Sequence, residues 1–161
     1  MAEYHNIEPL YDKKSRILIL GSFPSVKSRE EQFFYAHPQN RFWRVMAALT
    51  ENEIPKTVEE KKTLLLNSKI AVWDVIKSCD ITGSGDSSIK NVVPNDITDI
   101  LKTGNIRAIY CNGQTSYKLY GRYIEPKTHI KATVLPSTSP ANAAYSLGKL
   151  MEKWEVIKEK L

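Results

Sequence analysis

The short apolar stretch Ile17-Leu18-Ile19-Leu20, followed directly by Gly21, decides the fold of this chain. An uninterrupted run of large aliphatic residues that ends at a glycine is typical of a strand buried on both faces, as in a parallel sheet. Three further stretches have the same character, namely Ile70–Val75, Ile106–Cys111 and Ala132–Leu135. We therefore predict a central sheet of four parallel strands.

Helical patterns lie between these strands. Asn40 is in the N-cap position of a helix over Arg41–Leu49, and Thr57 with Glu60 forms a capping box for the next helix. Further helices are predicted from Pro94-Asn95-Asp96 to near Gly104, over Gln114–Tyr123, and from Tyr145 to the end of the chain. This alternation favours a three-layer α/β/α fold, in one domain over residues 1–161. Ligands of such sheets bind at the carboxyl ends of the strands.

Composition and missing motifs exclude several classes of protein. The chain of 161 residues has a formal net charge of +5, which permits a polyanionic partner without proving one. No apolar run approaches the roughly 18 residues of a membrane span, and the first ten residues lack the apolar region of a signal peptide. No phosphate-binding loop, nucleophile elbow, HExxH or CxxC motif occurs, so no metal or cofactor is expected. We expect a monomer in a reducing cytoplasm.

Two loops interrupt the regular pattern, and both follow the carboxyl end of a predicted strand. The first covers residues 21–40 and is rich in aromatic side chains, of which Tyr35 is placed to stack on a planar ligand such as a nucleobase. The alternative is that the aromatic residues belong to the core, above all Phe42 and Trp43 at helical positions. Asp74, at the end of the second strand, either faces the cleft or caps the following turn.

The second loop covers residues 135–142. The hydroxyl and backbone N–H groups of Ser137, Thr138 and Ser139 are of the kind that bind phosphates. The alternative is an ordinary helix start, with Ser139 as N-cap and Pro140 at the first helical position. Because both loops follow strand ends of one parallel sheet, they are expected to reach the same cleft.

These motifs together resemble the uracil-DNA glycosylase superfamily. The resemblance rests on the strings GSFPS (21–25), YAHPQNRFW (35–43), WDVI (73–76) and LPSTSPAN (135–142). They are most similar to the hypoxanthine-DNA glycosylase (DNA-deoxyinosine glycosylase) branch, and the likeness extends from Arg16 to Trp154. One position departs from the pattern, because Phe23 stands where related enzymes have a catalytic Asn or Asp. The hypoxanthine branch implies that the catalytic role belongs to Asn40, and its alternative role as a helix N-cap does not exclude this.

The resemblance also implies the other site residues. Ser22, Phe23, Tyr35 and Asp74 are expected to contact the base. The residues expected at the DNA are Ser25, His37, Arg41, Ser137, Thr138, Ser139, Ala141 and Asn142.

The implied activity is excision of deaminated bases, hypoxanthine first, by hydrolysis of the N-glycosidic bond, which leaves an abasic site in base-excision repair. The expected partner is double-stranded DNA that carries a deaminated base, and single-stranded DNA is left open as a second substrate. No cofactor and no membrane are expected. Three alternatives are a mismatch-specific uracil-DNA glycosylase, an inactive nucleic-acid-binding domain of the same fold, and an α/β enzyme acting on a small molecule.

Overall fold

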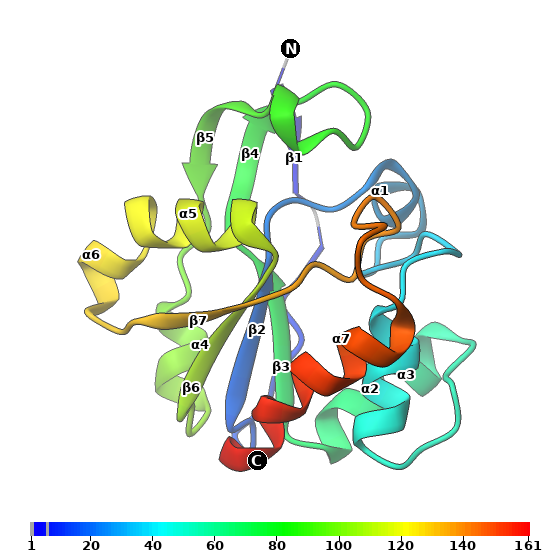
Figure 1. Ribbon diagram of the computed structural model, residues 1–161. Helices are drawn as coiled ribbons and strands as arrows, with labels where there is room; N and C mark the ends of the chain where they lie inside the picture. Colours follow the sequence, from blue (N-terminus) through cyan, green and yellow to red (C-terminus); the bar gives the residue numbers. More distant parts are fainter. Residues whose placement is uncertain (1, 6) are drawn as a thin grey trace.

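The computed structural model describes residues 2–5 and 7–161 and has the predicted parallel sheet at its centre (Figure 1). Its strands are β2 (Ile17–Gly21), β3 (Ile70–Asp74), β6 (Ala108–Asn112) and β7 (Ala132–Leu135), in the order β3-β2-β6-β7. The pairings of β2 with β3, of β2 with β6 and of β6 with β7 are all parallel. Every residue of β2 is buried, as expected for an inner strand that is covered on both faces.

Alternate residues of β2 point into two separate cores. Ile17 and Ile19 belong to the core that the sheet shares with α2 (Phe42–Leu49), α3 (Val58–Asn67) and α7 (Leu147–Trp154). Leu18 and Leu20 belong to the core on the other face, which includes side chains of α4 (Thr98–Thr103) and α5 (Gln114–Tyr123). The short helix α6 (Glu125–Thr128) follows α5. The predicted three-layer α/β/α fold is therefore confirmed.

The helix starts agree with the sequence only in part. α2 begins at Phe42, one residue later than expected, with Arg41 and not Asn40 in its N-cap position, because Asn40 Oδ1 accepts from the Phe42 N–H in a turn that precedes the helix. Thr57 and Glu60 form the predicted capping box of α3, and α5 has the predicted bounds. The helix expected from Pro94 begins only at Thr98, because residues Lys90–Pro94 form a strand. The C-terminal helix is shorter than expected: α7 ends at Trp154 and continues as the 3-10 helix η2 (Glu155–Lys160). The helices in the described part of the chain lack the length and apolarity that crossing a membrane requires.

A second sheet was not predicted from the sequence. It is antiparallel, in the order β1-β4-β5, and consists of β1 (Ala2–Tyr4), β4 (Ile76–Asp80) and β5 (Lys90–Pro94). Its outer strands are largely exposed, so they lack the apolar runs that identify a buried strand. The sheet is joined to β3 through the buried Asn95, whose Nδ2 donates to the carbonyls of Asp74 (2.9 Å) and Ile76 (3.2 Å).

Both long loops contain turns that are closed by local hydrogen bonds. The first contains α1 (Val26–Glu31), which is capped by the Ser25 side chain. The aromatic residues of this region that were expected in the core are buried there, namely Phe33, Phe34, Phe42 and Trp43. In the second loop, the alternative of a helix that starts at Ser139 is wrong. Ser139 Oγ accepts from the Ala141 N–H in a turn, and α7 begins later, capped by Ser146.

Candidate active site

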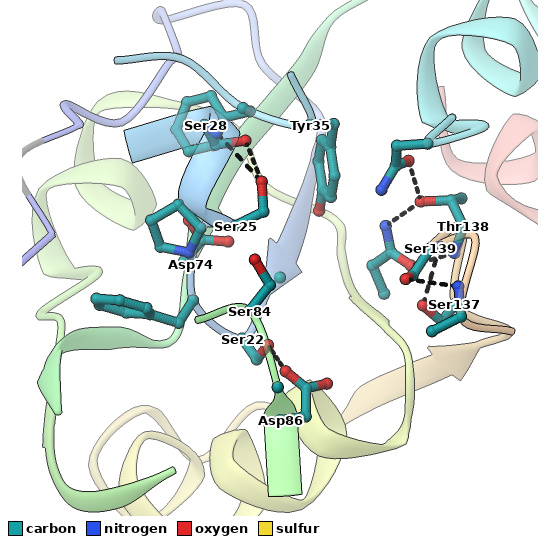
Figure 2. A pocket seen from close by; sticks show the side chains of 18 residues that line it. Ser22, Ser25, Ser28, Tyr35, Asp74, Ser84, Asp86, Ser137, Thr138 and Ser139 are labelled. Carbon is teal, nitrogen blue, oxygen red and sulfur yellow. Dashed lines mark hydrogen bonds between the residues drawn. The ribbon is translucent and has the colours of Figure 1, made fainter. Parts of the chain in front are cut away.

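A pocket of about 260 Å³ lies at the carboxyl ends of β2, β3 and β6, between the two long loops. Figure 2 shows Ser22, Ser25, Asp74 and Ser84 on one side of it, Ser137, Thr138 and Ser139 on the other, and Tyr35 between them. The predicted site residues that line the pocket are Ser22, Phe23, Ser25, Tyr35, Asn40, Asp74, Ser137, Thr138, Ser139 and Ala141. The sheet thus brings both predicted loops to one cavity, as the position of the strand ends implied.

Asn40 has its side-chain oxygen fully occupied. Oδ1 accepts hydrogen bonds from the N–H of Phe42 (2.9 Å) and from the hydroxyl of Thr138 (2.8 Å). Because the Phe42 N–H is a donor, the oxygen of the amide must face it, and this fixes the orientation of the whole group. Nδ2 makes no hydrogen bond among the described residues. Asn40 therefore satisfies the first turn of α2 and also keeps an N–H donor for a ligand in the pocket.

Thr138 connects three segments of the chain through one hydroxyl group. Its side chain is fully buried, and Oγ1 accepts from Asn112 Nδ2 (3.0 Å) while it donates to Asn40 Oδ1. The Thr138 N–H also donates to Asn112 Oδ1 (3.0 Å). Asn112 is the last residue of β6, so the end of that strand holds the second loop against Asn40, two residues before the start of α2.

Asp74 offers one oxygen of a deeply buried carboxylate to the pocket. The residue is 4% exposed, and its Oδ2 lies 2.6 Å from His5 Nε2. Oδ1 has no hydrogen-bond donor among the described residues. A Cβ on Gly21 would lie 2.4 Å from this Oδ1 and 3.0 Å from the Tyr35 hydroxyl. A glycine at position 21 is therefore what allows both groups to approach the same point of the pocket. The alternative role of Asp74, as a cap of the turn after β3, is not supported, because in the described chain its carboxylate accepts no hydrogen bond from that turn.

Tyr35 carries a buried hydroxyl group without a hydrogen-bond partner among the described residues. Its ring stacks on Phe42, with 4.1 Å between ring centres, and its backbone has a left-handed φ of 51°. Burial, together with the charge of Asp74, raises the pKa of Tyr35 far above its usual value, and the Asn112 side chain opposes this shift. The phenol therefore stays protonated and remains a donor. A strained backbone and an unsatisfied hydroxyl in one pocket residue point to a functional role.

Phe23 is part of the pocket wall and contributes packing. It is 9% exposed, its ring lies edge-on to His5 with 6.0 Å between ring centres, and the Arg29 guanidinium carbon is 5.4 Å from its ring centre. The backbone contact to a base that the resemblance implies for Ser22 and Phe23 stays a prediction.

Arg41 lies outside the pocket lining and fastens the second loop. Its guanidinium donates to the carbonyls of Ser139 (2.8 Å), Asn142 (3.1 Å) and Tyr145, and its Nε donates to that of Thr138 (3.4 Å). Backbone carbonyls thus occupy the planar donor array that would suit a phosphate.

His37 and Asn142 also lie outside the lining. His37 is exposed, and its Nδ1 accepts from the Gln39 N–H. Asn142 folds back on its own loop, with Nδ2 donating to the Ser137 carbonyl (3.0 Å). Ala141 is exposed and borders the pocket, so it is the residue of this loop placed to meet a neighbouring strand of DNA. The DNA contacts expected for all three residues stay predictions.

Sequence reasoning missed several residues of the site. Asn112 carried a usable signal, because it directly follows the predicted strand Ile106–Cys111 and so lies at a strand end, as Asp74 does. Ser84, Gly85 and Asp86 belong to the loop between β4 and β5, which could not be foreseen without the antiparallel sheet. Burial raises the pKa of the Asp86 carboxyl, and hydrogen bonds from Thr115 and Ser22 oppose this. His5, behind Asp74, carried no signal in the sequence.

Fold and site together define a protein of the uracil-DNA glycosylase type, and the comparisons with known proteins agree. Residues 8–159 match the family described as the uracil DNA glycosylase superfamily, and the chain belongs to this superfamily. The resemblance drawn from the sequence motifs is thereby confirmed.

Relatives and a solved structure match nearly the whole chain. A hypoxanthine DNA glycosylase of Methanosarcina acetivorans is 36% identical over 151 residues, which cover 91% of this chain and 92% of the relative. A hypoxanthine DNA glycosylase of Methanosarcina barkeri is 32% identical over 111 residues, 67% of this chain and 70% of the relative. A solution NMR structure from Methanosarcina acetivorans, described as a candidate uracil DNA glycosylase, matches with a TM-score of 0.82 and 31% identity, and covers 98% of this chain and 96% of that one.

Proposed function

We propose that this protein is a DNA glycosylase that hydrolyses the N-glycosidic bond of a deaminated base, hypoxanthine first, and leaves an abasic site for base-excision repair. The observation that carries the proposal is the pair of groups beside Gly21, where Asp74 Oδ1 is an acceptor without a partner and the Tyr35 hydroxyl is a donor without one. The family and the named relatives support the same class of reaction.

This pair of groups complements the edge that deamination creates on a base. Deamination of adenine to hypoxanthine, or of cytosine to uracil, replaces an amino group by a carbonyl and turns a ring nitrogen acceptor into an N–H donor. A carboxylate oxygen accepts from that N–H and repels the lone pair of the parent base, while a phenol donates to the new carbonyl. Sites built on such hydrogen bonds discriminate strongly, because a mismatched base leaves buried polar groups unpaired.

The base must leave the helical stack to reach this pocket, which is lined by strand ends and loops. Base flipping costs a few kcal/mol and costs least at a mispaired base. The second loop, with Ala141 at the mouth of the pocket, is fastened by Arg41 and Thr138 and is rigid enough to hold the opened duplex. Ser137 and Ser139 border the pocket beside it and supply hydroxyl groups for the flanking phosphates.

Bond cleavage requires stabilisation of two developing charges. The sugar gains positive charge at C1′, and the departing base takes up the electron pair of the broken bond. The free Nδ2 of Asn40 is a donor, so it suits an acceptor atom of the leaving base or the oxygen of the attacking water. The lining of the pocket in the described chain contains no lysine, so water is the nucleophile in our proposal. The water oxygen forms a bond to C1′, the proton that it loses is taken up by the departing base, and the products are the free base and an abasic site.

DNA is the substrate of this class of enzyme. We place the activity on double-stranded DNA that carries a deaminated base and assign it to a monomer. The compartment we propose is a reducing cytoplasm with access to the genomic DNA, since Cys79 and Cys111 are buried free thiols.

The test is release of free base from a panel of oligonucleotides. Each carries inosine, uracil, xanthine or thymine, opposite guanine or its usual partner, in duplex and single-stranded form, and abasic sites are detected as strand breaks after alkali. We expect the fastest release from inosine and none from unmodified adenine. Release of uracil alone from G·U pairs would replace our proposal by a mismatch-specific uracil-DNA glycosylase. Binding without release of any base would indicate an inactive binding domain.

A further inference from the structure

His5 lies behind the wall of the pocket, directly after β1, and both of its ring nitrogens have polar partners. Its side chain is 0% exposed, and its ring lies edge-on to those of Phe23 and Trp73, with 6.0 Å and 6.3 Å between ring centres. Nδ1 accepts from the N–H of Ile7 (3.2 Å), and Nε2 lies 2.6 Å from Asp74 Oδ2. Among the described residues, the hydrogen bond that connects the histidine to the pocket lining is therefore the one to Asp74, while Phe23 contacts it by packing.

The two partners determine which nitrogen carries the proton. Because a backbone N–H is always a donor, Nδ1 must be the nitrogen with the lone pair, and the proton belongs on Nε2. The Nε2–H then donates to Asp74 Oδ2, in a contact as short as those typical of charged groups. A neutral imidazole in this state fixes the carboxylate and leaves its negative charge in place.

This contact sets the direction of the other carboxylate oxygen. The hydrogen bond from His5 to Oδ2 restrains rotation of the carboxylate. The hydrogen bond from Asn95 to the Asp74 carbonyl restrains movement of the strand end. Oδ1 then stays at the point beside Gly21 and the Tyr35 hydroxyl. Without His5, the carboxylate loses its only hydrogen bond in the described chain and is free to turn toward Tyr35 or toward water.

We propose that His5 is a positioning residue for base selection: it orients Asp74 so that Oδ1 accepts the ring N–H of an extruded lactam base, while the neighbouring carbonyl of the base accepts from Tyr35. This inference rests on the proposed glycosylase function and extends it to a residue of the second sheet. It predicts that selectivity depends on the donor at Nε2 and not on the volume of the ring.

Two variants separate the donor from the packing. His5→Gln keeps an N–H donor at similar reach but loses the ring, whereas His5→Phe keeps the ring among Phe23 and Trp73 but has no donor. Each variant is assayed under single turnover on duplexes that carry inosine or 1-methylinosine, in which a methyl group replaces the ring N–H. Unfolding temperatures are measured alongside, and wild-type release of hypoxanthine is established first.

We expect wild type to cleave the inosine duplex much faster than the 1-methylinosine duplex. His5→Phe should lower the maximal rate on inosine roughly 10- to 100-fold, as for loss of one hydrogen bond to a charged group, and should reduce the ratio between the two substrates. His5→Gln should retain most of the wild-type rate on inosine and most of the wild-type ratio between the two substrates. In an Asp74→Ala background, His5→Phe should cause no further loss, because the histidine acts through that carboxylate.

Other outcomes overturn specific parts of the argument. If wild type is active and His5→Phe matches it in rate and ratio, the histidine only packs and the positioning role is refuted while the glycosylase function stands. If wild type releases no base, the proposed function itself fails. A measurement on the wild-type protein decides the case if His5→Phe does not fold. In nitrogen-15 spectra of the imidazole rings, a His5 proton on Nδ1 contradicts the proposal, and one on Nε2 supports it.

Discussion

Thr138 Oγ1 lies 2.8 Å from Asn40 Oδ1, although the two residues are 98 positions apart in the chain. The contact makes the orientation of the Asn40 amide depend on the second loop, and it makes the loop depend on the start of α2. Asn112 completes the arrangement by holding Thr138 through both its backbone N–H and its hydroxyl. The residue expected to act on the bond and the loop expected to hold the DNA are therefore parts of one hydrogen-bonded unit.

The donor of Asn40 is separable from its structural role by substitution with aspartate. Asn40→Asp keeps acceptors for the Phe42 N–H and the Thr138 hydroxyl but removes the free N–H donor. We expect stability close to wild type and single-turnover cleavage lower by about 10²-fold or more, the scale for loss of one oriented donor. Asn40→Ala should lose a similar amount of activity and also about 1–2 kcal/mol of stability, because the Phe42 N–H and the Thr138 hydroxyl both lose their acceptor. An aspartate variant with wild-type activity would show that the donor is not used.

The hydroxyl of Thr138 should matter more than its methyl group. Thr138→Val preserves the shape but leaves the half-buried Asn40 Oδ1 and Asn112 Nδ2 each short of a partner, at a cost of about 1–2 kcal/mol of stability. We expect activity to fall in addition, because the Asn40 amide is free to rotate. Thr138→Ser is the matched control, since it keeps the hydroxyl and should cleave nearly as fast as wild type. Equal activity of the valine and serine variants would exclude an orienting role for this network.

The sequence predicted the central sheet well, because buried parallel strands are marked by apolar runs such as Ile17–Leu20 that few other structures produce. The sequence also predicted correctly that both loops lie at one edge of the sheet, because this follows from the direction of the strands alone. The antiparallel sheet was missed because strands such as β1 and β5 are mostly exposed and carry no such run. Asp86 and His5 were missed for the same reason, because the strands of the antiparallel sheet place both residues at the site.

Side-chain roles were harder to predict than positions. Asn40 was identified correctly as lying both at a helix start and at the pocket, but its sequence position says nothing about which end of the amide is free. Arg41 lies in a motif with clear DNA-binding expectations, yet its guanidinium is directed to backbone carbonyls of a loop about a hundred residues away. Such contacts depend on tertiary geometry, and no local pattern encodes them.

The salt dependence of DNA binding should show whether Arg41 stabilises the second loop or contacts a phosphate. Each neutralised phosphate contributes about 0.9 to the slope of log affinity against log salt. Because loop carbonyls occupy its donors, Arg41→Gln should leave this slope unchanged and increase hydrogen exchange in residues 137–142. The matched control is Arg44→Gln. The Arg44 guanidinium is exposed and makes a long hydrogen bond to the Pro38 carbonyl (3.4 Å), so it is available to a phosphate. Its removal should lower the slope by about 1. A lower slope for Arg41→Gln would assign this arginine to the DNA after all.

Tyr35→Phe should make the protein more stable and less active. The hydroxyl is buried without a partner, so its removal should raise the free energy of unfolding by about 1 kcal/mol at pH 7. The same change removes the donor proposed for the base carbonyl, and hypoxanthine release should fall while binding to undamaged DNA stays the same. A variant that is destabilised but fully active would contradict both parts of this argument.

The pH dependence of stability provides an independent check on the same residue. Burial raises the pKa of Tyr35 in the folded protein far above its usual value, whereas an unfolded tyrosine ionises near pH 10. Above that pH the unfolded chain binds fewer protons than the native protein, so stability must fall as pH rises. Phenylalanine cannot ionise, so the gain in stability of Tyr35→Phe over wild type should widen between pH 8 and about pH 10.5, as measured by urea unfolding at each pH. A constant difference across this range would mean that the hydroxyl titrates normally and has access to water in the folded state. The pocket would then lack the desolvated hydrogen-bond donor on which the proposed base selection depends.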